Sequence, residues 1–529
     1  MTTARITPVT GSPAGSLGAI ARGGTANLIG AGISAVATFA VVAIVTNRVP
    51  AEVAGSFFAS TSVFLVAIAI AELGSDVSLA RWLPHYLVER RTSAARVCLR
   101  VCLRSVLIAG LVCGAAMLVA GPPLAPLVGG ATDQHEVVVG LLALAVFVPV
   151  AGVYDTVIAA TRGYGSMRPS ALVERVGRSL LQVAAVALAA LAGASLAWLS
   201  IAWAIPYGVG LVVGWWWLLR LVREAETQRR PSPIGAAAVT REYWAYTMPR
   251  AIARICQILL QRADIILVAV LRSPTEAAVY TAATRFLVLG QLVALAVQNV
   301  LAPQLSKLLA RGDRVAAERV FQVTTAWTMA VTWPLYLISI GLAPLLLSIF
   351  GGTYATGDLV VVLLAVSTVV SAVCGPVDTV LLMAGGSGRS LINNALALLV
   401  DLALDILLIP SMGMLGAAIG WAAAIVVRNV LPLLQVRGQL QMTPFTNAVW
   451  WVAGLTVVCF GLPPLALRFF FGLHWWSAAL VVGVSCVVYA VALLSRPDLL
   501  ALDSFASMVP RRLRPLITHR PASLKENYS

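Results

Sequence analysis

A stripe of polar side chains runs along one helix-length, otherwise apolar segment, residues 245–271. Its members follow the first at spacings of 4, 7, 11 and 14 positions: Arg250, Arg254, Gln257, Gln261 and Asp264. On an α-helix, which turns by about 100° per residue, these positions fall within an arc of about 80°. A charged side chain near the bilayer centre costs roughly 2.5–3.5 kcal/mol, so the stripe is predicted to face a wet cavity or another part of the protein.

Each charge on this stripe also has a structural interpretation. Arg250 could extend to the cytoplasmic interface, as arginines near helix ends do. Arg254 lies deeper in the segment, and its position favours a place in a cavity wall. Asp264 could instead form a structural ion pair with Arg262 or with Arg285 of the next segment.

A second polar stripe lies on the segment 390–410. Its members, at spacings of 0, 7 and 11 positions, are Asn394, Asp401 and Asp405. Ionisable residues within a membrane segment indicate a functional site by default. The two aspartates could bind a coupling ion or pair with a basic residue elsewhere. Glu72, with Asp76 at i+4 near a segment end, is a further candidate for ion coupling.

The composition is that of a polytopic membrane protein. Of 529 residues, 60% are hydrophobic and 11% charged, whereas soluble proteins carry about 25% charged residues. The net charge of +15 favours basic cytoplasmic loops over a nucleic-acid partner. The cysteines and histidines show no metal-ligand spacing, so we expect no metal, no cofactor and cysteines that pack as small apolar groups. The predicted outer loops offer little beyond Asp133, His135 and Glu136, which argues against an enzyme.

Fourteen segments are apolar and long enough to cross a membrane as helices. They cover residues 25–46, 54–73, 99–120, 137–160, 171–193, 196–219, 245–271, 277–302, 319–341, 359–383, 390–410, 413–435, 448–470 and 475–494. Because this number is even, both termini lie on one side. Most of the 37 basic residues fall on that side, which identifies it as cytoplasmic. We therefore expect a multi-pass protein of the cytoplasmic membrane with both termini in the cytoplasm.

Two independent matches indicate an internal repeat. The pattern Arg-x-Pro-x-Glu occurs from Arg48 and again from Arg272, at an offset of 224. The sequence DTVIAATRG from Asp155 matches DTVLLMAGG from Asp378, at an offset of 223. The repeat shifts the chain by six spans, and because six is even the two halves share one orientation, as in one class of secondary transporters.

The repeat predicts an all-α architecture with about fourteen transmembrane helices, arranged as two parallel six-helix lobes around a central cavity plus two C-terminal helices. The expected parts are an N-terminal tail 1–24, an N-lobe 25–221, a cytoplasmic linker 222–241, a C-lobe 242–438, a final helix pair 448–495 and a basic C-terminal tail 496–529. The first span has only uncharged polar residues where the seventh has its stripe. The basic side of the cavity is therefore expected on the second lobe.

Four stretches of the chain carry a family pattern. They are RVPAEVAGSFFASTSV, RADIILVAVLRSPTEAAVYTAATR, LAPQLSKLLARGD and LLIPSMGMLGAAIGWA. Together they resemble the Wzx-type polysaccharide flippases of the multidrug/oligosaccharidyl-lipid/polysaccharide superfamily, over roughly residues 20–440. The resemblance implies two lobes that alternate between inward-facing and outward-facing states. It also implies transfer of an undecaprenyl-diphosphate-linked oligosaccharide from the inner to the outer leaflet, for cell-surface polysaccharide synthesis.

The resemblance also suggests roles for the polar residues. Residues that would attract a diphosphate or sugars are Arg250, Arg254, Gln257, Gln261, Arg285 and Gln291. The ion-coupling candidates, for protons or sodium ions, are Asp401, Asp405, Asp264 and Glu72. Expected partners are the lipid bilayer, a polysaccharide polymerase and glycosyltransferases. Two alternatives stay open: a proton- or sodium-coupled exporter of small molecules, and a lipid II flippase, although the first span lacks the arginine–aspartate pattern of the latter.

Overall fold

The architecture was determined from a computed structural model, which describes the chain except for residues 1–12, 131, 227–234 and 497–529. All regular structure in the described residues is helical, and this confirms the all-α class expected from the sequence. Half of the predicted N-terminal tail, part of the predicted linker and nearly all of the basic C-terminal tail lie outside the described residues.

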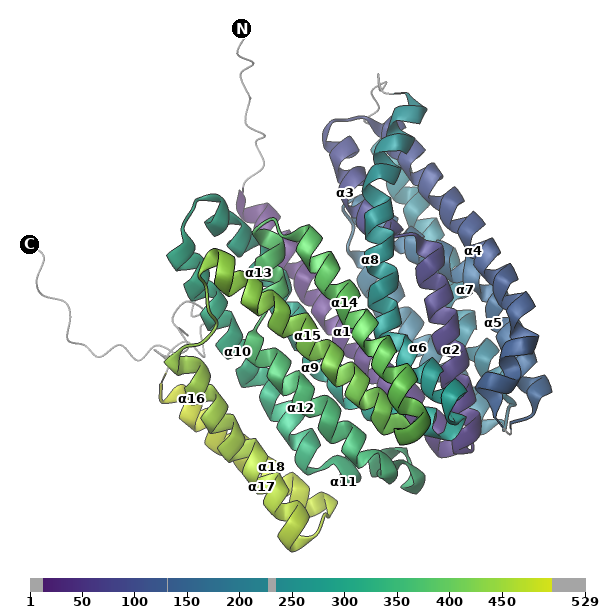
Figure 1. Cartoon of the computed structure of the whole chain (residues 1–529). Helices are drawn as coiled ribbons and strands as arrows, with labels where there is room; N and C mark the ends of the chain where they lie inside the picture. The colour runs from purple at the N-terminus through teal and green to yellow at the C-terminus, as the bar shows by residue number, and fades with distance from the viewer. Residues whose placement is uncertain (1–12, 131, 227–234, 497–529) are drawn as a thin grey trace, which may run out of the picture. The chain divides into compact units, whose positions relative to one another are not determined.

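Long α-helices and a few short 3-10 and π segments make up the described chain (Figure 1). The first group is α1 (Pro13–Arg48), α2 (Ala51–Glu72), α3 (Ser75–Val88), α4 (Thr92–Gly129), α5 (Gln134–Gly163), η1 (Ser170–Arg178), α6 (Ser179–Leu191), α7 (Leu196–Glu226) and α8 (Ala236–Leu271). The second group is α9 (Pro274–Ala310), α10 (Arg314–Gly341), α11 (Ala343–Leu347), η2 (Ser348–Phe350), η3 (Gly352–Gly357), α12 (Asp358–Cys374), α13 (Val377–Met383), α14 (Ser387–Met412), α15 (Met414–Leu440), α16 (Asn447–Thr456), η4 (Val457–Gly461), α17 (Leu462–Ala466), η5 (Leu467–Phe471) and α18 (Trp475–Leu494).

Within the described residues, 12 helical stretches are long and apolar enough to cross a membrane. Twelve of the fourteen predicted spans correspond to them, although the predicted span 359–383 continues past the end of α12 at Cys374 into α13. The other two, predicted at 171–193 and 245–271, are helical as η1 with α6 and as α8. Both begin with charged residues, which lowers their hydropathy. For these two segments, passage through the membrane stays a prediction.

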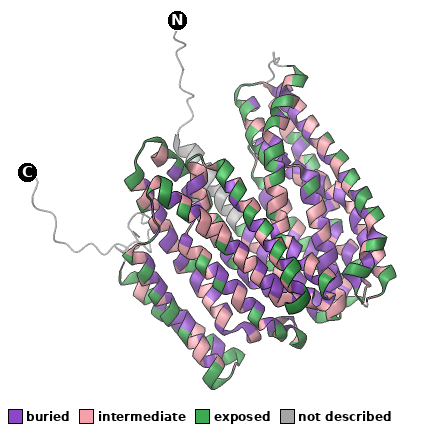
Figure 2. Cartoon of the chain, viewed as in Figure 1, coloured by how far each residue is buried: buried purple, intermediate pink, exposed green. Residues whose placement is uncertain are grey.

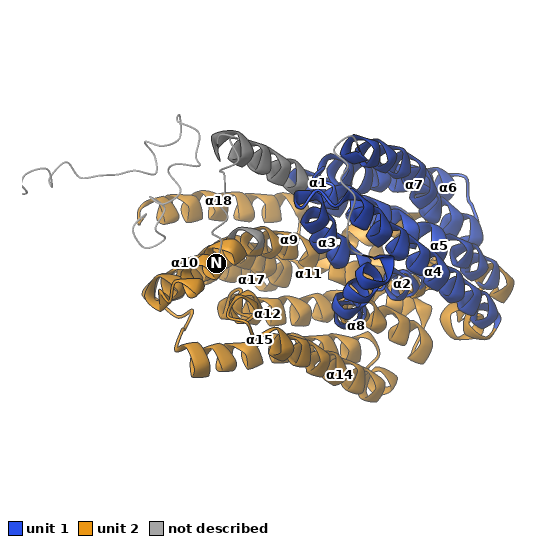
Figure 3. Cartoon of the chain, turned by 90° about the horizontal axis from the view of Figure 1, so that it is seen from above, with its two compact units in different colours: residues 1–44, 64–122, 138–255 blue, residues 45–63, 123–137, 256–529 orange. Residues whose placement is uncertain are grey.

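The chain divides into two compact units, coloured separately in Figure 3. Unit 1 comprises residues 1–44, 64–122 and 138–255, and unit 2 comprises residues 45–63, 123–137 and 256–529. The division falls inside α8, so the polar stripe is split: its two arginines belong to unit 1, and its two glutamines and its aspartate to unit 2. The concentration of basic residues on the predicted second lobe, residues 242–438, stays a prediction, since this division places the start of that lobe in unit 1.

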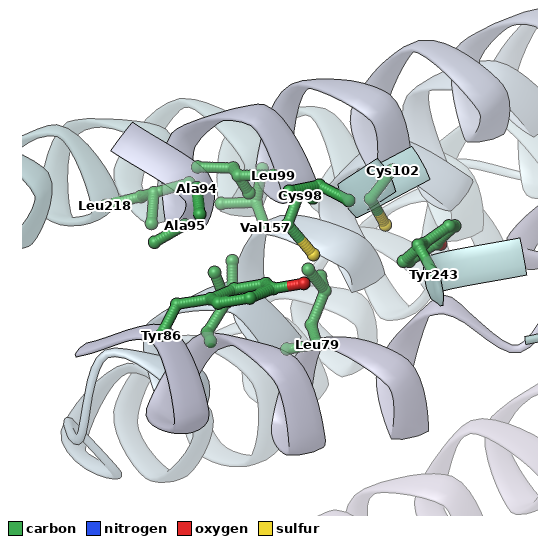
Figure 4. Close-up of a cluster of buried hydrophobic side chains, with 14 of the residues drawn as sticks. Leu79, Tyr86, Ala94, Ala95, Cys98, Leu99, Cys102, Val157, Leu218 and Tyr243 are labelled. Atoms are coloured by element: carbon green, nitrogen blue, oxygen red, sulfur yellow. The ribbon is translucent and has the colours of Figure 1, made fainter. Parts of the chain in front are cut away.

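Unit 1 has a conventional apolar core at one end of its helices (Figure 4). Tyr86 on α3, Cys98 and Cys102 on α4, Leu218 on α7 and Tyr243 on α8 are all buried in it. Both cysteines are free thiols, as are the other five of the chain. The predicted packing role of cysteine is thus confirmed for these two residues, because each fills core volume as a small hydrophobe.

In unit 2, helices α14 and α15 are joined by the single residue Gly413 and pack side by side (Figure 1). Figure 2 shows how buried and exposed residues are distributed along the helices. Leu399 and Leu407 on helix α14 are exposed, whereas Asp401 and Asp405 are fully buried. This is the reverse of a helix in water, and it suits a helix whose outer face meets lipid. The two aspartates are thereby directed into the unit.

The second copy of the repeat motif ties two helix turns together in unit 2. Ser273 caps α9 by accepting a hydrogen bond from the backbone N–H of Glu276, at 3.2 Å. The Glu276 carboxylate accepts bonds from the backbone N–H of Met414, at 2.8 Å, and from Nε of Arg272, at 3.0 Å. The motif therefore fixes the α8–α9 turn against the α14–α15 turn, and so positions the aspartates of α8 and α14.

Candidate functional site: an acidic cluster and a polar cavity

Three carboxyl groups come together inside unit 2: Asp264 on α8, and Asp401 and Asp405 on α14. One oxygen of each lies within 4.8 Å of the others. The residues are 3%, 0% and 0% exposed, respectively. Asp401 and Asp405 stand one helical turn apart on the same face, and α8 supplies the third group. Three of the four predicted ion-coupling candidates thus form one cluster.

Hydrogen bonds satisfy only a small part of this cluster. The Tyr280 hydroxyl donates to Oδ2 of Asp264 at 2.5 Å. Oδ1 of Asp264 and both oxygens of Asp401 and of Asp405 are buried without a hydrogen-bond partner among the described residues. Buried polar atoms are nearly always paired, so five unpaired carboxyl oxygens at one place need an explanation.

Arginines do not provide the missing partners. Across the described residues, no ion pair includes any of the three aspartates, so the alternative in which Asp264 pairs with Arg262 or Arg285 is wrong. Arg285 instead donates to the backbone oxygen of Thr281 at 3.1 Å and to Oγ1 of Thr284 at 3.2 Å. Both bonds are local to its own helix, and the predicted substrate-binding role of Arg285 stays a prediction.

Gly420 on α15 makes the close approach of α14 and α15 possible at this point. A Cβ at position 420 would collide with Oδ1 of Asp405 and lie 3.2 Å from the backbone oxygen of Asp401. The absence of a side chain lets the neighbouring helix lie directly on the cluster. Glycine at a helix contact commonly has this purpose inside membranes.

The cluster has the chemistry of a cation or proton site. Three carboxylates this close cannot all remain ionised in a buried place unless positive charge is present among them. Hard cations take carboxylate oxygens at about 2.3–2.6 Å, and an oxygen-to-oxygen separation of up to 4.8 Å fits ligands on opposite sides of one such ion. The residues can therefore hold a hard cation or share protons.

The fourth ion-coupling candidate, Glu72, lies in unit 1 with Arg254. Nε of Arg254 is 3.9 Å from Oε2 of Glu72, and Glu72 is only 6% exposed. Asp155 on α5 and Arg178 at the end of η1 add an acid and a base to the same charged group. Neither was among the predicted site residues, because their helices are separated from Glu72 by long stretches of sequence.

A break between α2 and α3 positions Glu72. Leu73 and Gly74 adopt positive φ angles of 51° and 69°, which ends one helix and starts the next. The expected i, i+4 arrangement of Glu72 and Asp76 on one helix is therefore wrong. A Cβ on Gly74 would lie 2.8 Å from the backbone nitrogen of Ala251 on α8, so this turn packs directly on the helix that carries Arg254.

A polar cavity of about 370 Å³ lies within unit 2, bounded by α8, α9, α10, α12, α13 and α15. It brings together three of the predicted substrate-binding residues: Gln257, Gln261 and Gln291. The other three do not line it. Arg285 makes the local bonds described above, and Arg250 and Arg254 belong to unit 1, where the Arg250 guanidinium lies 5.4 Å from the centre of the Tyr246 ring.

The cavity also contains functional groups that sequence reasoning missed. Asp378 enters it because Gly375, with φ of 66°, ends α12, and α13 begins at Val377, one residue before the aspartate. Arg428 and Trp421 enter it from α15. The DTV repeat had drawn attention to Asp378, but nothing in the sequence placed it opposite an arginine of another helix.

Comparison with known proteins agrees with this fold. The family model described as "Polysaccharide biosynthesis protein" matches residues 20–309, more than half of the chain, and the MatE family model matches residues 249–407. Among curated proteins, none matches the sequence.

Several solved transporters share the fold. The lipid II flippase MurJ, in an inward closed conformation, matches with a TM-score of 0.69 and 13% identity, over 90% of this chain and 98% of that chain. An inward-facing MATE multidrug transporter of the MOP superfamily matches with a TM-score of 0.60 and 16% identity, over 77% and 94%. A mutant of the Vibrio cholerae MATE transporter VcmN matches with a TM-score of 0.58 and 14% identity, over 81% and 97%. This chain is thus a multi-pass membrane protein with the fold of the MOP superfamily, and it belongs to the polysaccharide biosynthesis protein family.

Proposed function

We propose that this protein moves a polyprenyl-diphosphate-linked oligosaccharide from the inner to the outer leaflet of the cytoplasmic membrane, for cell-surface polysaccharide synthesis. One observation carries the proposal: the acidic cluster and the polar cavity share two helices. Helix α8 bears Gln261 in the cavity wall and Asp264 in the cluster. Helix α15 bears Trp421 in the cavity wall and Gly420 against Asp405.

Shared helices give a physical route for ion coupling. Filling the cluster with sodium or protons removes repulsion between its carboxylates and favours close packing of α8, α14 and α15. The cavity wall moves with two of these helices, so cation binding and substrate binding become linked, and each changes the affinity of the other by the same factor. We assign Asp264, Asp401 and Asp405 to the coupling ion, in an antiport mechanism by alternating access.

The basic residues of unit 1 suit the charged part of such a substrate. Arg250 is exposed, and Nε of Arg254 lies 3.9 Å from Oε2 of Glu72. Guanidinium groups bind phosphate oxygens through paired, charge-assisted hydrogen bonds. We assign both arginines to the diphosphate. When the diphosphate leaves, Glu72 would pair with Arg254. Proton binding to Glu72 would compete with this pairing, so Glu72 would also respond to protons.

Deletion of the gene tests this function. Undecaprenyl-linked glycan should accumulate in the inner leaflet of the deletion strain, and surface polysaccharide should fall, with both restored by the wild-type gene. The measurement is extraction of lipid-linked glycan together with an accessibility assay on intact and permeabilised cells. Unchanged surface polysaccharide in a strain without a second flippase would refute the proposal.

A cation-coupled exporter of small molecules is the second candidate. The MatE family model favours it, because its matched residues 249–407 include the whole acidic cluster. Drug sensitivity of the deletion strain with unchanged glycans would support this candidate. Accumulation of lipid II in place of oligosaccharide lipids would instead support a peptidoglycan role, as the name of the MurJ match suggests.

A further inference from the structure

The wall of the unit 2 cavity is rich in uncharged hydrogen-bonding groups. Glutamines come from α8 and α9, hydroxyls from α10, α12 and α13, and an amide from α15: Gln257, Gln261, Gln291, Gln298, Thr328, Thr332, Thr368, Ser371, Thr379 and Asn429. Gln261, Gln291 and Gln298 form no hydrogen bond with any described residue and are exposed at the cavity. Each offers a donor and an acceptor to a ligand.

The hydroxyls on α10 have their protons committed to their own helix. Thr328 donates to the backbone oxygen of Thr324 at 2.8 Å, and Thr332 donates to that of Thr328 at 2.7 Å. The Asn429 amide likewise donates to the backbone oxygen of Ile425 at 2.7 Å. What the two threonines present to the cavity is therefore acceptor oxygen, and Asn429 adds its amide oxygen and its second N–H, which suits a ligand that carries several hydroxyls.

Among the described residues, the only charged ones in the cavity wall are one acid and one base, Asp378 and Arg428. They interact electrostatically, yet no ion pair joins them in the described part of the chain. Oδ1 of Asp378 is buried without a hydrogen-bond partner among the described residues. A hydroxyl placed between the two can accept from the guanidinium and donate to the carboxylate, which satisfies both groups and leaves the cavity neutral.

We propose that this cavity is a subsite for an uncharged sugar ring. Hydroxyls of the ring bond the glutamines and the threonine oxygens, and one hydroxyl bridges Arg428 and Asp378. Trp421 and Tyr336 supply aromatic surface for the apolar face of the ring. The subsite rests on the proposed function, in which it would hold the glycan part of the substrate.

The same charges disfavour other ligands. The carboxylate of an acidic sugar, or a phosphate, could bond Arg428 but would also approach Asp378, and the repulsion would oppose binding. A polyprenyl chain would leave the glutamines and the carboxylate without partners, at a cost in buried polar groups. The cavity thus selects against the acidic and the lipid parts of a glycolipid.

Binding of free sugars to the purified, full-length protein in lipid nanodiscs tests the subsite. The probes are glucose, galactose, mannose, rhamnose and N-acetylglucosamine at millimolar concentration, with glucuronate and inorganic diphosphate as charged probes. The readout is saturation-transfer difference NMR. At least one neutral sugar should bind, and glucuronate and diphosphate should not compete with it. Variants Gln291→Leu and Asp378→Asn should bind about tenfold more weakly.

Gln304→Leu is the matched control, because Gln304 is an exposed glutamine on the same helix, α9, and does not line the cavity. It should bind the sugar as the wild type does. Failure of every neutral sugar to bind would overturn the subsite, and so would competition by glucuronate or equal loss in the control. If sugars bind while the deletion strain accumulates no lipid-linked glycan, the proposed function fails and the sugar site stands. If no sugar binds while the deletion strain accumulates lipid-linked glycan, the sugar site fails and the proposed function stands.

Discussion

At the level of single residues, Asp405 gives the most direct test of the acidic cluster. Asp405→Asn keeps the size of the side chain and removes one negative charge, so affinity for a cation should fall. Wild-type protein should gain about 1.4 kcal/mol of stability at a cation concentration ten times Kd, seen as a higher Tm in sodium than in choline chloride. The variant should lose this difference.

Asp133→Asn is the control for this measurement, because Asp133 precedes α5 outside the cluster and accepts a bond from the backbone N–H of His135 that asparagine can also accept. It should keep the wild-type response to sodium. Sodium-independent Tm in the wild type, combined with no effect of pH on transport, would remove the cluster from ion coupling.

A second residue-scale prediction separates the two roles of Arg254. Arg254→Ala leaves Glu72 buried without its cation, which should cost between about 1 kcal/mol, as for surface pairs, and about 3 kcal/mol, as for buried pairs. Adding Glu72→Gln should restore most of that stability. Thermal unfolding and transport are measured on both variants.

If Arg254 binds the diphosphate, the stable double variant should still transport poorly. Wild-type transport by the double variant would show that the arginine serves only to neutralise Glu72. Glu72→Gln alone is the reference for the effect of the carboxylate.

At the level of elements, the contact between α14 and α15 depends on a missing side chain. Gly420→Ala places a methyl group on Oδ1 of Asp405 and should destabilise the protein by about 1–3 kcal/mol, with loss of the sodium response. Gly438→Ala, on the same helix with open space around it, should be neutral or slightly stabilising. Equal Tm values for the two variants would mean that α14 and α15 can move apart at little cost. The close approach of the two helices at the acidic cluster would then not depend on Gly420.

For the whole molecule, topology is the property that charge predicts. The number of spans is even in either case: twelve from the apolar stretches alone, or fourteen if η1 with α6 and α8 also cross. The termini should therefore lie on the same side. The basic loops place that side in the cytoplasm. A fluorescent reporter fused at the C-terminus should therefore be active, and alkaline phosphatase fused there should not. Fusions after Asp133 should show the reverse, and the same reporter active at both places would refute the predicted orientation.

The sequence by itself determined the membrane class, the helices and the residues on each polar face. Hydropathy and helical period are local properties, and they suffice to place Gln257 and Gln261 on one face of α8, and Asp401 and Asp405 on one face of α14. The repeat could also be read from sequence, because matched motifs at equal offsets need no structure. Local backbone breaks were less visible: the predicted span 54–73 ended beside Glu72, but nothing in the sequence placed Glu72 and Asp76 on two separate helices.

Only the tertiary structure decided which of these faces meet. Asp264 is more than a hundred residues from Asp401, and their approach depends on how α8, α14 and α15 pack, which the glycine at position 420 permits. The same packing divides the stripe of α8: Arg254 lies near Glu72, whereas Gln257 and Gln261 line a cavity in which Arg428 lies opposite Asp378. Distances between helices are set by side chains far apart in the chain, so a periodic pattern can show that a helix has a polar face but cannot show what that face contacts.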